Sequence, residues 1–353
     1  MTLSQTANLT KKIITLSLLI LFLGTVSFIG YKTWHAYTIA HLPPVEEKPD
    51  TKFGLLPKPD FPASSVSSSN YSYSLDTSTG SLPKIGIDPG FDKIIKVYFI
   101  TKSFSSLLSP EKSQNLAMKF NINSEPQILS DIKYNFSDQG KSLIVNLDTG
   151  NFLYNKEATI SGKETLDSDD QLVSGFEQTL NILGVLTDDI KKGRTKITLL
   201  KSQGNSLVPT NLRAEAQAVQ ISIWPQNIDK KAIFTPDFNK ALINAEVYKS
   251  AADLDGYISI QFINFPIENT TFATYPTKTA ESAYADLKSG KGVIVLEPTK
   301  PQVSISSVYL GYYLSDNYNP YLEPIYVFEG QGFMAYVPAI TDEFYYSAQV
   351  KFE

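Results

Sequence analysis

The chain has 353 residues, of which 42% are hydrophobic and 19% charged, so it has enough apolar material for a packed core and is not a disordered protein. It has 0 cysteines, which excludes disulfides, thiol nucleophiles and cysteine-ligated metal sites, and its net charge of −5 gives no general basic surface for nucleic acid. Its 2 histidines, His35 and His41, both lie near an apolar N-terminal segment. Histidine-based triads and zinc motifs are therefore excluded from the rest of the chain, where only carboxylate, Lys, Tyr or Ser chemistry is open.

Residues 13–31 (IITLSLLILFLGTVSFIGY) carry no charge, and a run of about 20 apolar residues spans a bilayer. Lys11 and Lys12 precede the run, and by the positive-inside rule they predict that residues 1–12 are cytoplasmic. Residues 13–31 are therefore expected to be a transmembrane helix in a single-pass protein of the cell membrane, with the bulk of the chain extracytoplasmic. A cleaved signal peptide remains the alternative.

Residues 32–81 are rich in proline and serine, which favour extended and coil conformations, so they are expected to form a juxtamembrane spacer. Within it, the apolar segment Phe53–Pro62 is expected to lie extended against the first folded domain. The remaining chain is expected to divide into a first α+β unit at 82–160 and a second α+β region at 161–353.

Apolar alternation predicts strands of antiparallel sheets, as in Leu143, Val145 and Leu147. The other expected strands lie at 93–101, 127–137, 196–201, 216–224, 241–249, 257–265, 303–314, 321–329 and 333–338. Capping signals and apolar stripes predict three helices, at 109–120, 168–183 and 278–289. Each helix has one apolar face to cover a sheet, so the fold class is α+β.

Two stretches share an order of helix, strand and hairpin, and their ends can be aligned as VNLDTGNF (145–152) and VPAITDEF (337–344). This order suggests a degenerate duplicated unit. The VNLDTGNF ending resembles that of PepSY-like domains, and YLEPIYVFEGQGFMAYVPAI (321–340) resembles the C-terminal part of the same superfamily, which includes the YycI/YycH-type extracytoplasmic regulators. The resemblance covers about 130 residues. In the second copy Asp342 stands where the first has Gly150, so its turn differs.

The resemblance implies two PepSY-like units behind a single N-terminal anchor, the layout of regulators that bind a sensor kinase or a peptidase in the envelope. Such domains are not catalytic and hold no cofactor. No partner-binding residue transfers from the family to this sequence.

Asp148-Thr149-Gly150 follows an apolar strand, as the catalytic loop of an aspartic protease does. A dimeric enzyme of that kind also has an apolar-apolar-Gly segment, for which Ile182–Gly184 is the candidate. The same three residues also suit a tight hairpin turn, because Gly adopts positive φ, and this is the preferred interpretation.

Acidic clusters at Asp167–Asp170 and Asp188–Asp189 suit a helix N-terminus and a loop, with calcium binding as the alternative. Asp253–Gly256 is expected to be an Asp-Gly hairpin turn. No metal or other cofactor is expected at these sites.

Tyrosines are dense near the C-terminus, and alternation divides them between the two faces of a strand. At least one set is exposed unless both faces are covered, so these rings either pack the sheet or form a recognition surface. The candidate partner-binding aromatics are Tyr309, Tyr312, Tyr313, Tyr318 and Tyr321.

The sequence thus predicts a non-enzymatic protein anchored in the membrane through residues 13–31, which regulates or scaffolds another protein of the cell envelope. Two alternatives remain. One is a carboxylate-based envelope hydrolase, such as a dimeric aspartic protease acting through Asp148, and the other is a surface adhesin or glycan-binding module.

Overall fold

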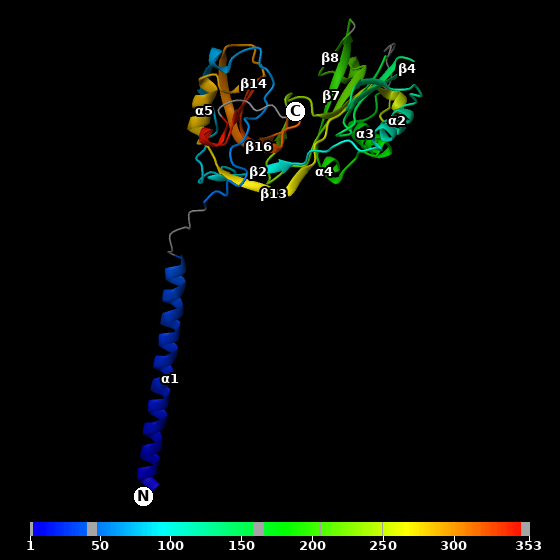
Figure 1. Cartoon of the computed structure of the whole chain (residues 1–353). Helices are drawn as coiled ribbons and strands as arrows, with labels where there is room; N and C mark the ends of the chain where they lie inside the picture. Colours follow the sequence, from blue (N-terminus) through cyan, green and yellow to red (C-terminus); the bar gives the residue numbers. More distant parts are fainter. Residues whose placement is uncertain (1–2, 41–47, 158–165, 205, 249, 347–353) are drawn as a thin grey trace. The chain divides into compact units, whose positions relative to one another are not determined.

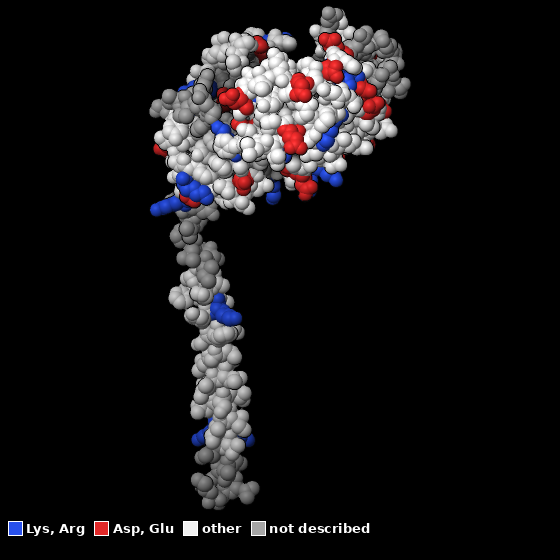
Figure 2. Space-filling model, turned by 45° about the vertical axis from the view of Figure 1, so that its right-hand side comes forward, with Lys and Arg blue, Asp and Glu red and all other residues white. Residues whose placement is uncertain are grey.

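The computed structural model describes residues 3–40, 48–157, 166–204, 206–248 and 250–346 (Figure 1). The chain forms two compact units, Met1–Lys48 and Pro49–Glu353. The first contains helix α1 (Leu3–Ala40), in which Thr10–Thr38 has a mean hydropathy of 2.4 and is long and apolar enough to cross a membrane. In Figure 2 the helix shows basic side chains near its two ends and uncharged surface between them, which matches the uncharged sequence between Lys12 and Lys32.

The second unit, called the body, contains two large sheets. The nine-stranded sheet has the order β3-β4-β5-β6-β12-β11-β9-β7-β8 and all its pairs are antiparallel. Its strands are β3 (Gln127–Ser130), β4 (Lys133–Asp138), β5 (Lys141–Asn146), β6 (Phe152–Lys156), β7 (Arg194–Gln203), β8 (Ser206–Pro209), β9 (Ala218–Trp224), β11 (Ile243–Val247) and β12 (Tyr257–Phe262).

The eight-stranded sheet has the main order β1-β15-β16-β17-β14. In addition, β10 pairs with β15 while β2 pairs with both β16 and β13. The pairs of β1 and β10 with β15 are parallel and the others antiparallel. The strands are β1 (Ser72–Leu75), β2 (Ile94–Ile100), β10 (Ile233–Phe234), β13 (Ile267–Pro276), β14 (Val293–Leu296), β15 (Gln302–Tyr313), β16 (Tyr321–Gly330) and β17 (Phe333–Pro338).

Helices cover one face of each sheet. On the nine-stranded sheet, α2 (Ser109–Lys119) and α3 (Asp169–Leu183) bury residues such as Ala117 and Phe176 against Phe136 and Ile260. On the eight-stranded sheet, α5 (Ala280–Lys288) buries one apolar face. The short helices are α4 (Asp188–Lys191) and the 3-10 turns η1 (Ser68–Asn70), η2 (Arg213–Glu215), η3 (Leu254–Gly256) and η4 (Asp342–Phe344). The α+β class with antiparallel sheets is therefore confirmed.

The three expected helices are present, and their ends follow from local chemistry. At the start of α3 the backbone N–H of Ser168 donates to Oε1 of Gln171 (3.1 Å), which is half of a capping box. Helix α3 ends at Gly184, which has a φ of 82°. Helix α2 differs by one residue from expectation, because Leu108 is its N-cap and Ser109 is already helical.

The spacer expected at 32–81 is wrong in two places. Residues up to Ala40 continue helix α1, and from Pro49 onward the chain belongs to the body. Leu56 is fully buried and forms a parallel bridge with Tyr345, and β1 pairs with β15. The apolar segment Phe53–Pro62 does dock on the body, against the eight-stranded sheet, where Leu56 packs with Val97 of β2 and Tyr275 of β13.

The boundary expected after residue 160 does not coincide with a sheet boundary. Strand β6 pairs with β12, so residues from both sides of that position share the nine-stranded sheet. Conversely, β2 lies in the eight-stranded sheet. The expected strand at 127–137 is a hairpin, β3–β4, and the expected Asp-Gly turn at 255–256 is the 3-10 turn η3, in which the Asp253 carboxylate accepts from the N–H of Asp255.

Candidate functional site

A cavity of about 540 Å³ lies where α2, the β5–β6 turn and the end of α3 meet, and we call it the Asp148 cavity. Lys119 of α2 joins two of its walls, because its Nζ donates to the carbonyls of Ile182 (2.9 Å) and Leu183 (3.1 Å) at the end of α3. These carbonyls have no partner within the helix, so the ammonium caps them favourably.

Asp148, Thr149 and Gly150 form the turn between β5 and β6. The Asn146 side chain accepts hydrogen bonds from the backbone N–H groups of Asp148 (3.0 Å) and Thr149 (3.1 Å). Gly150 has a φ of 73°, a conformation that glycine adopts without strain. Asp148, Thr149 and Gly150 therefore have the backbone conformation and hydrogen bonds of a hairpin turn.

The carboxylate of Asp148 is half-buried and accepts a hydrogen bond from the N–H of Ser105 (2.8 Å), which fixes the loop before α2. Leu183 and Gly184 also line the cavity, but as the end of α3 and its left-handed cap, where a protease would have a strand. Among the described residues that line this cavity, Asp148 is the one carboxylate. A dyad with a shared proton is not formed within this cavity by these residues.

Exposed apolar side chains lie on two segments next to this cavity, the loop before α2 and the β3–β4 hairpin, and we call them the apolar patch: Phe104, Leu107, Leu108, Ile128, Leu129 and Ile132. Phe104 is 72% exposed and lines the cavity, and Leu107 is 100% exposed. The carbonyl of Ile132 accepts from the N–H of Leu147, so the β3–β4 turn lies beside the Asp148 turn. Large apolar groups gathered at one place on a surface are typical of interaction sites.

The apolar patch includes the edge of the nine-stranded sheet. Strand β3 is the outermost strand on this side, and all four of its residues are exposed. The apolar patch was not predicted from the sequence. The available signal was SFSSLLSP (103–110), in which two leucines stand in a serine-rich stretch directly before a helix.

The candidate tyrosines are mostly packed in the sheet. Tyr312 and Tyr313 are buried on opposite faces of β15, and their hydroxyls donate to the carbonyls of Lys96 (3.2 Å) and Asp60 (2.8 Å). Because both faces of β15 are covered, the tyrosine rings on neither face are exposed. These two residues therefore cannot form a recognition surface.

The other three candidates are half-buried and held by local contacts. Tyr309 donates to Glu329 Oε2 (2.9 Å) and Tyr318 donates to the carbonyl of Ile100 (3.1 Å). Tyr321 stacks on Phe53, with ring centroids 5.0 Å apart. The five rings do not form one continuous exposed surface.

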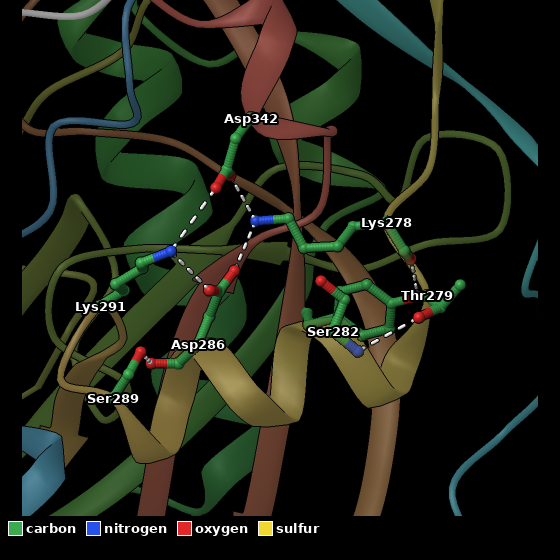
Figure 3. Close-up of polar contacts among 8 residues, drawn as sticks. Lys278, Thr279, Ser282, Asp286, Ser289, Lys291 and Asp342 are labelled. Atoms are coloured by element: carbon green, nitrogen blue, oxygen red, sulfur yellow. Dashed lines mark hydrogen bonds and ion pairs between the residues drawn. The ribbon is translucent and has the colours of Figure 1, made fainter.

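A cluster of four charged residues lies beside α5, with Lys278 before the helix, Asp286 in its C-terminal half and Lys291 after its end (Figure 3). The Nζ of Lys278 lies between two carboxylates, at 2.6 Å from Asp286 Oδ2 and 2.7 Å from Asp342 Oδ1. Lys291 contacts the same pair from the other side, at 3.0 Å from Asp286 and 3.6 Å from Asp342. The hydrogen bond from Lys278 lowers the pKa of Asp342 below its usual value. The cluster joins α5 to η4, and each of its four charged residues contacts an opposite charge, as expected of ion pairs that stabilise a fold.

The acidic clusters are engaged by neighbouring side chains. Asp169 forms an ion pair with Arg213 (2.6 Å), and Asp167 accepts from the Ser250 hydroxyl (2.8 Å). Asp188 and Asp189 lie in the first turn of α4. Within the described parts of the chain, no group of three or more His, Asp or Glu residues is placed to hold a metal ion.

Comparison with known proteins gives little further information. No family model and no curated protein matches the chain. A solved structure of an uncharacterized protein from Eubacterium rectale is similar over 80% of this chain and 91% of its own, with 13% identity and a TM-score of 0.36.

Proposed function

We propose that this protein is a membrane-anchored, extracytoplasmic, non-enzymatic protein that binds another protein of the cell envelope through the apolar patch and regulates or scaffolds it. The observation that carries the proposal is the patch itself, which places Phe104 and Leu107 in solvent beside a cavity of about 540 Å³. Exposing such side chains is unfavourable in isolation, and covering them with a partner removes apolar surface from water.

The anchor gives the proposal its location. Lys11 and Lys12 lie directly before the apolar part of α1, and the positive-inside rule then orients the N-terminus toward the cytoplasm and the body away from it. The resemblance of residues 145–152 and 321–340 to PepSY-like and YycI/YycH-type regulators supports the same role, with two degenerate PepSY-like units in the body.

The edge strand suggests how a partner is bound. Strand β3 has no charged residue and no proline, the devices with which proteins commonly protect an edge. An extended partner segment can pair with this edge while its side chains cover Ile128 and Leu129. The Asp148 cavity next to it then accepts one larger apolar side chain.

Site-specific photo-crosslinking in intact cells of the native host tests the proposal. A photoreactive phenylalanine analogue replaces Leu107 in the patch. Leu212 serves as the control, because it is also exposed (58%) but follows β8, the strand at the opposite edge of the nine-stranded sheet from β3. We expect one discrete adduct from position 107 and none from position 212. The double variant Phe104→Ser, Leu107→Ser should lose the same partner in co-purification, whereas Leu212→Ser should keep it. Equal adducts at positions 107 and 212, or no adduct when the analogue replaces Phe104, Leu107 or Ile128 in turn, would overturn the proposal.

A further inference from the structure

A second cavity, of about 840 Å³, is lined by residues of both sheets, and we call it the Arg194 cavity. Arg194 at the start of β7 belongs to the nine-stranded sheet, whereas Tyr309 of β15 and Glu329 of β16 belong to the eight-stranded sheet. Its lining residues include three cations, one carboxylate, three aromatic rings and two amides: Lys192, Arg194, Lys230, Glu329, Phe234, Phe238, Tyr309, Gln226 and Asn227. The Arg194 cavity shares no lining residue with the Asp148 cavity.

Arg194 is unusual in this chain. The sequence has two arginines, and the other, Arg213, is paired with Asp169. The guanidinium of Arg194 lies over the ring of Trp224, 4.2 Å from its centroid, and no carboxylate or other acceptor contacts it in the described residues. Stacking holds the plane of the guanidinium and leaves its N–H donors free for a planar fork with an anion.

The platform under Arg194 is rigid. Trp224 is 1% exposed, pairs with Arg194 across the β7–β9 ladder, and donates from Nε1 to the Thr235 hydroxyl (3.1 Å). Gly193 makes the close approach possible, because a Cβ at this position would lie 2.0 Å from the carbonyl oxygen of Trp224. The backbone thus fixes where Lys192 and Arg194 enter the cavity.

The charges of the cavity are not balanced. Glu329 accepts from the Tyr309 hydroxyl (2.9 Å) and makes no ion pair in the described residues, and Lys230 has no ion-pair partner there. The one ion pair of Lys192, with Asp188, is 4.0 Å long and solvent-exposed on both sides, so it is weak. The cavity therefore has an excess of two positive charges in a chain of net charge −5.

We propose that the Arg194 cavity binds a sugar phosphate, either as a free molecule or as a unit of an envelope polymer. The guanidinium of Arg194 forms two parallel hydrogen bonds to phosphate oxygens, and Lys192 and Lys230 add charge at the rim. The half-buried rings of Phe238 and Tyr309 pack against the sugar ring. The amides of Gln226 and Asn227 bind its hydroxyls, since amides both donate and accept.

Trp224 provides the measurement, because it and Trp34 of α1 are the two tryptophans of the chain. The full-length Trp34→Phe protein in detergent micelles is titrated with glucose 1-phosphate, inorganic phosphate, glucose and a glycosylated poly(glycerol phosphate). We expect a saturable change in Trp224 emission with glucose 1-phosphate or the polymer, weaker binding of inorganic phosphate and none of glucose. Whichever of the two sugar-phosphate probes binds more tightly identifies the source.

Variants separate binding from folding. Arg194→Lys keeps the positive charge but loses the two parallel N–H donors of the guanidinium, and we expect at least about tenfold weaker binding. Lys230→Asn removes a charge at the rim of the cavity, so we expect severalfold weaker binding. The variant should keep the fold, because Asn suits the left-handed backbone of this position (φ 62°). Arg213→Lys is the matched control and should bind as the parent does. Calorimetry replaces fluorescence for the Arg194 variant, whose stacking on Trp224 is altered.

The proposal is overturned if neither sugar-phosphate probe binds at about 10 mM, a limit that corresponds to negligible affinity. It is equally overturned if inorganic phosphate binds as tightly as glucose 1-phosphate, or if Arg194→Lys and Arg213→Lys have the same effect. The affinity should also fall as salt is added, because the contacts are ionic.

Discussion

The Glu323 carboxyl and the Tyr345 hydroxyl are both fully enclosed in the body, and neither makes a hydrogen bond of acceptable geometry. Burial raises the pKa of Glu323 well above its usual range, an effect that the nearby Tyr345 and Asn319 side chains only partly offset. Glu323 faces Tyr313 across the β15–β16 ladder, so an uncompensated acid lies inside the eight-stranded sheet.

Glu323→Gln should therefore stabilise the body at neutral pH. The pKa of Glu323 is higher in the folded protein than in the unfolded chain. Its contribution to the stability of the body is therefore complete below the unfolded pKa of 4.5 and is lost as the pH rises toward the folded pKa. We expect the variant to gain about 1–3 kcal/mol at pH 7 and nothing at pH 4. Denaturant unfolding between these two pH values measures the difference, and a gain that does not depend on pH would contradict this account.

The buried ion pair predicts a loss of stability. Lys278→Met leaves Asp286 with only the exposed Lys291, because the side chain of Lys278 is 6% exposed and that of Lys291 61%. Breaking a buried pair costs about 3–5 kcal/mol, whereas an exposed pair contributes about 0–1 kcal/mol. Thermal unfolding of Lys278→Met and the matched Lys291→Met should show this order, and equal effects would mean that Lys278 has no special role.

Asp342 should make the body sensitive to acid. The hydrogen bond from Lys278 lowers the pKa of Asp342 below the usual 3.8. The contribution of Asp342 to the free energy of unfolding is therefore complete above pH 3.8 and is lost as the pH falls through the folded pKa. Asp342→Asn should therefore be less stable than the parent at pH 6, with a smaller difference at pH 2. Circular dichroism at several pH values checks this, and an unchanged difference at pH 2 would be inconsistent with it.

Two neighbouring leucines test whether the segment after Pro49 is part of the body. Leu56 is 0% exposed and Leu55 is 44% exposed. Removing a buried leucine side chain costs about 2–5 kcal/mol, so Leu56→Ala should unfold at a clearly lower denaturant concentration. Leu55→Ala should change the free energy of unfolding by less than about 0.5 kcal/mol. Similar small effects of both would indicate that the segment is a spacer after all.

Local chemistry made the helices predictable. Ser168 and Gln171, or Pro110 at the start of α2, are signals that act within a few residues, and the apolar stripes behind them had to face a sheet. Strands with clean alternation, such as β5 and β12, were predictable for the same reason.

The rest depended on pairing between distant residues. Strand β1 lies in a serine-rich stretch and is a strand because Ser72–Leu75 pairs with Gln302–Ile305. Strand β13 carries mostly polar exposed residues in its first half, where alternation gives no signal. The burial of Tyr312 and Tyr313 follows from the cover on both faces of β15, which periodicity alone does not show.

The hydrogen bonds that hold the first residues of the body have a mechanical consequence. The N–H of Asp50 donates to the Thr274 hydroxyl (2.7 Å), and the N–H of Thr274 donates to the carbonyl of Asp50 (2.9 Å). Tension on a membrane-held N-terminus would reach this pair first and then the enclosed Leu56. Because Leu56 is hydrogen-bonded to Phe344 and Tyr346, such a load would be shared with the last described residues of the chain.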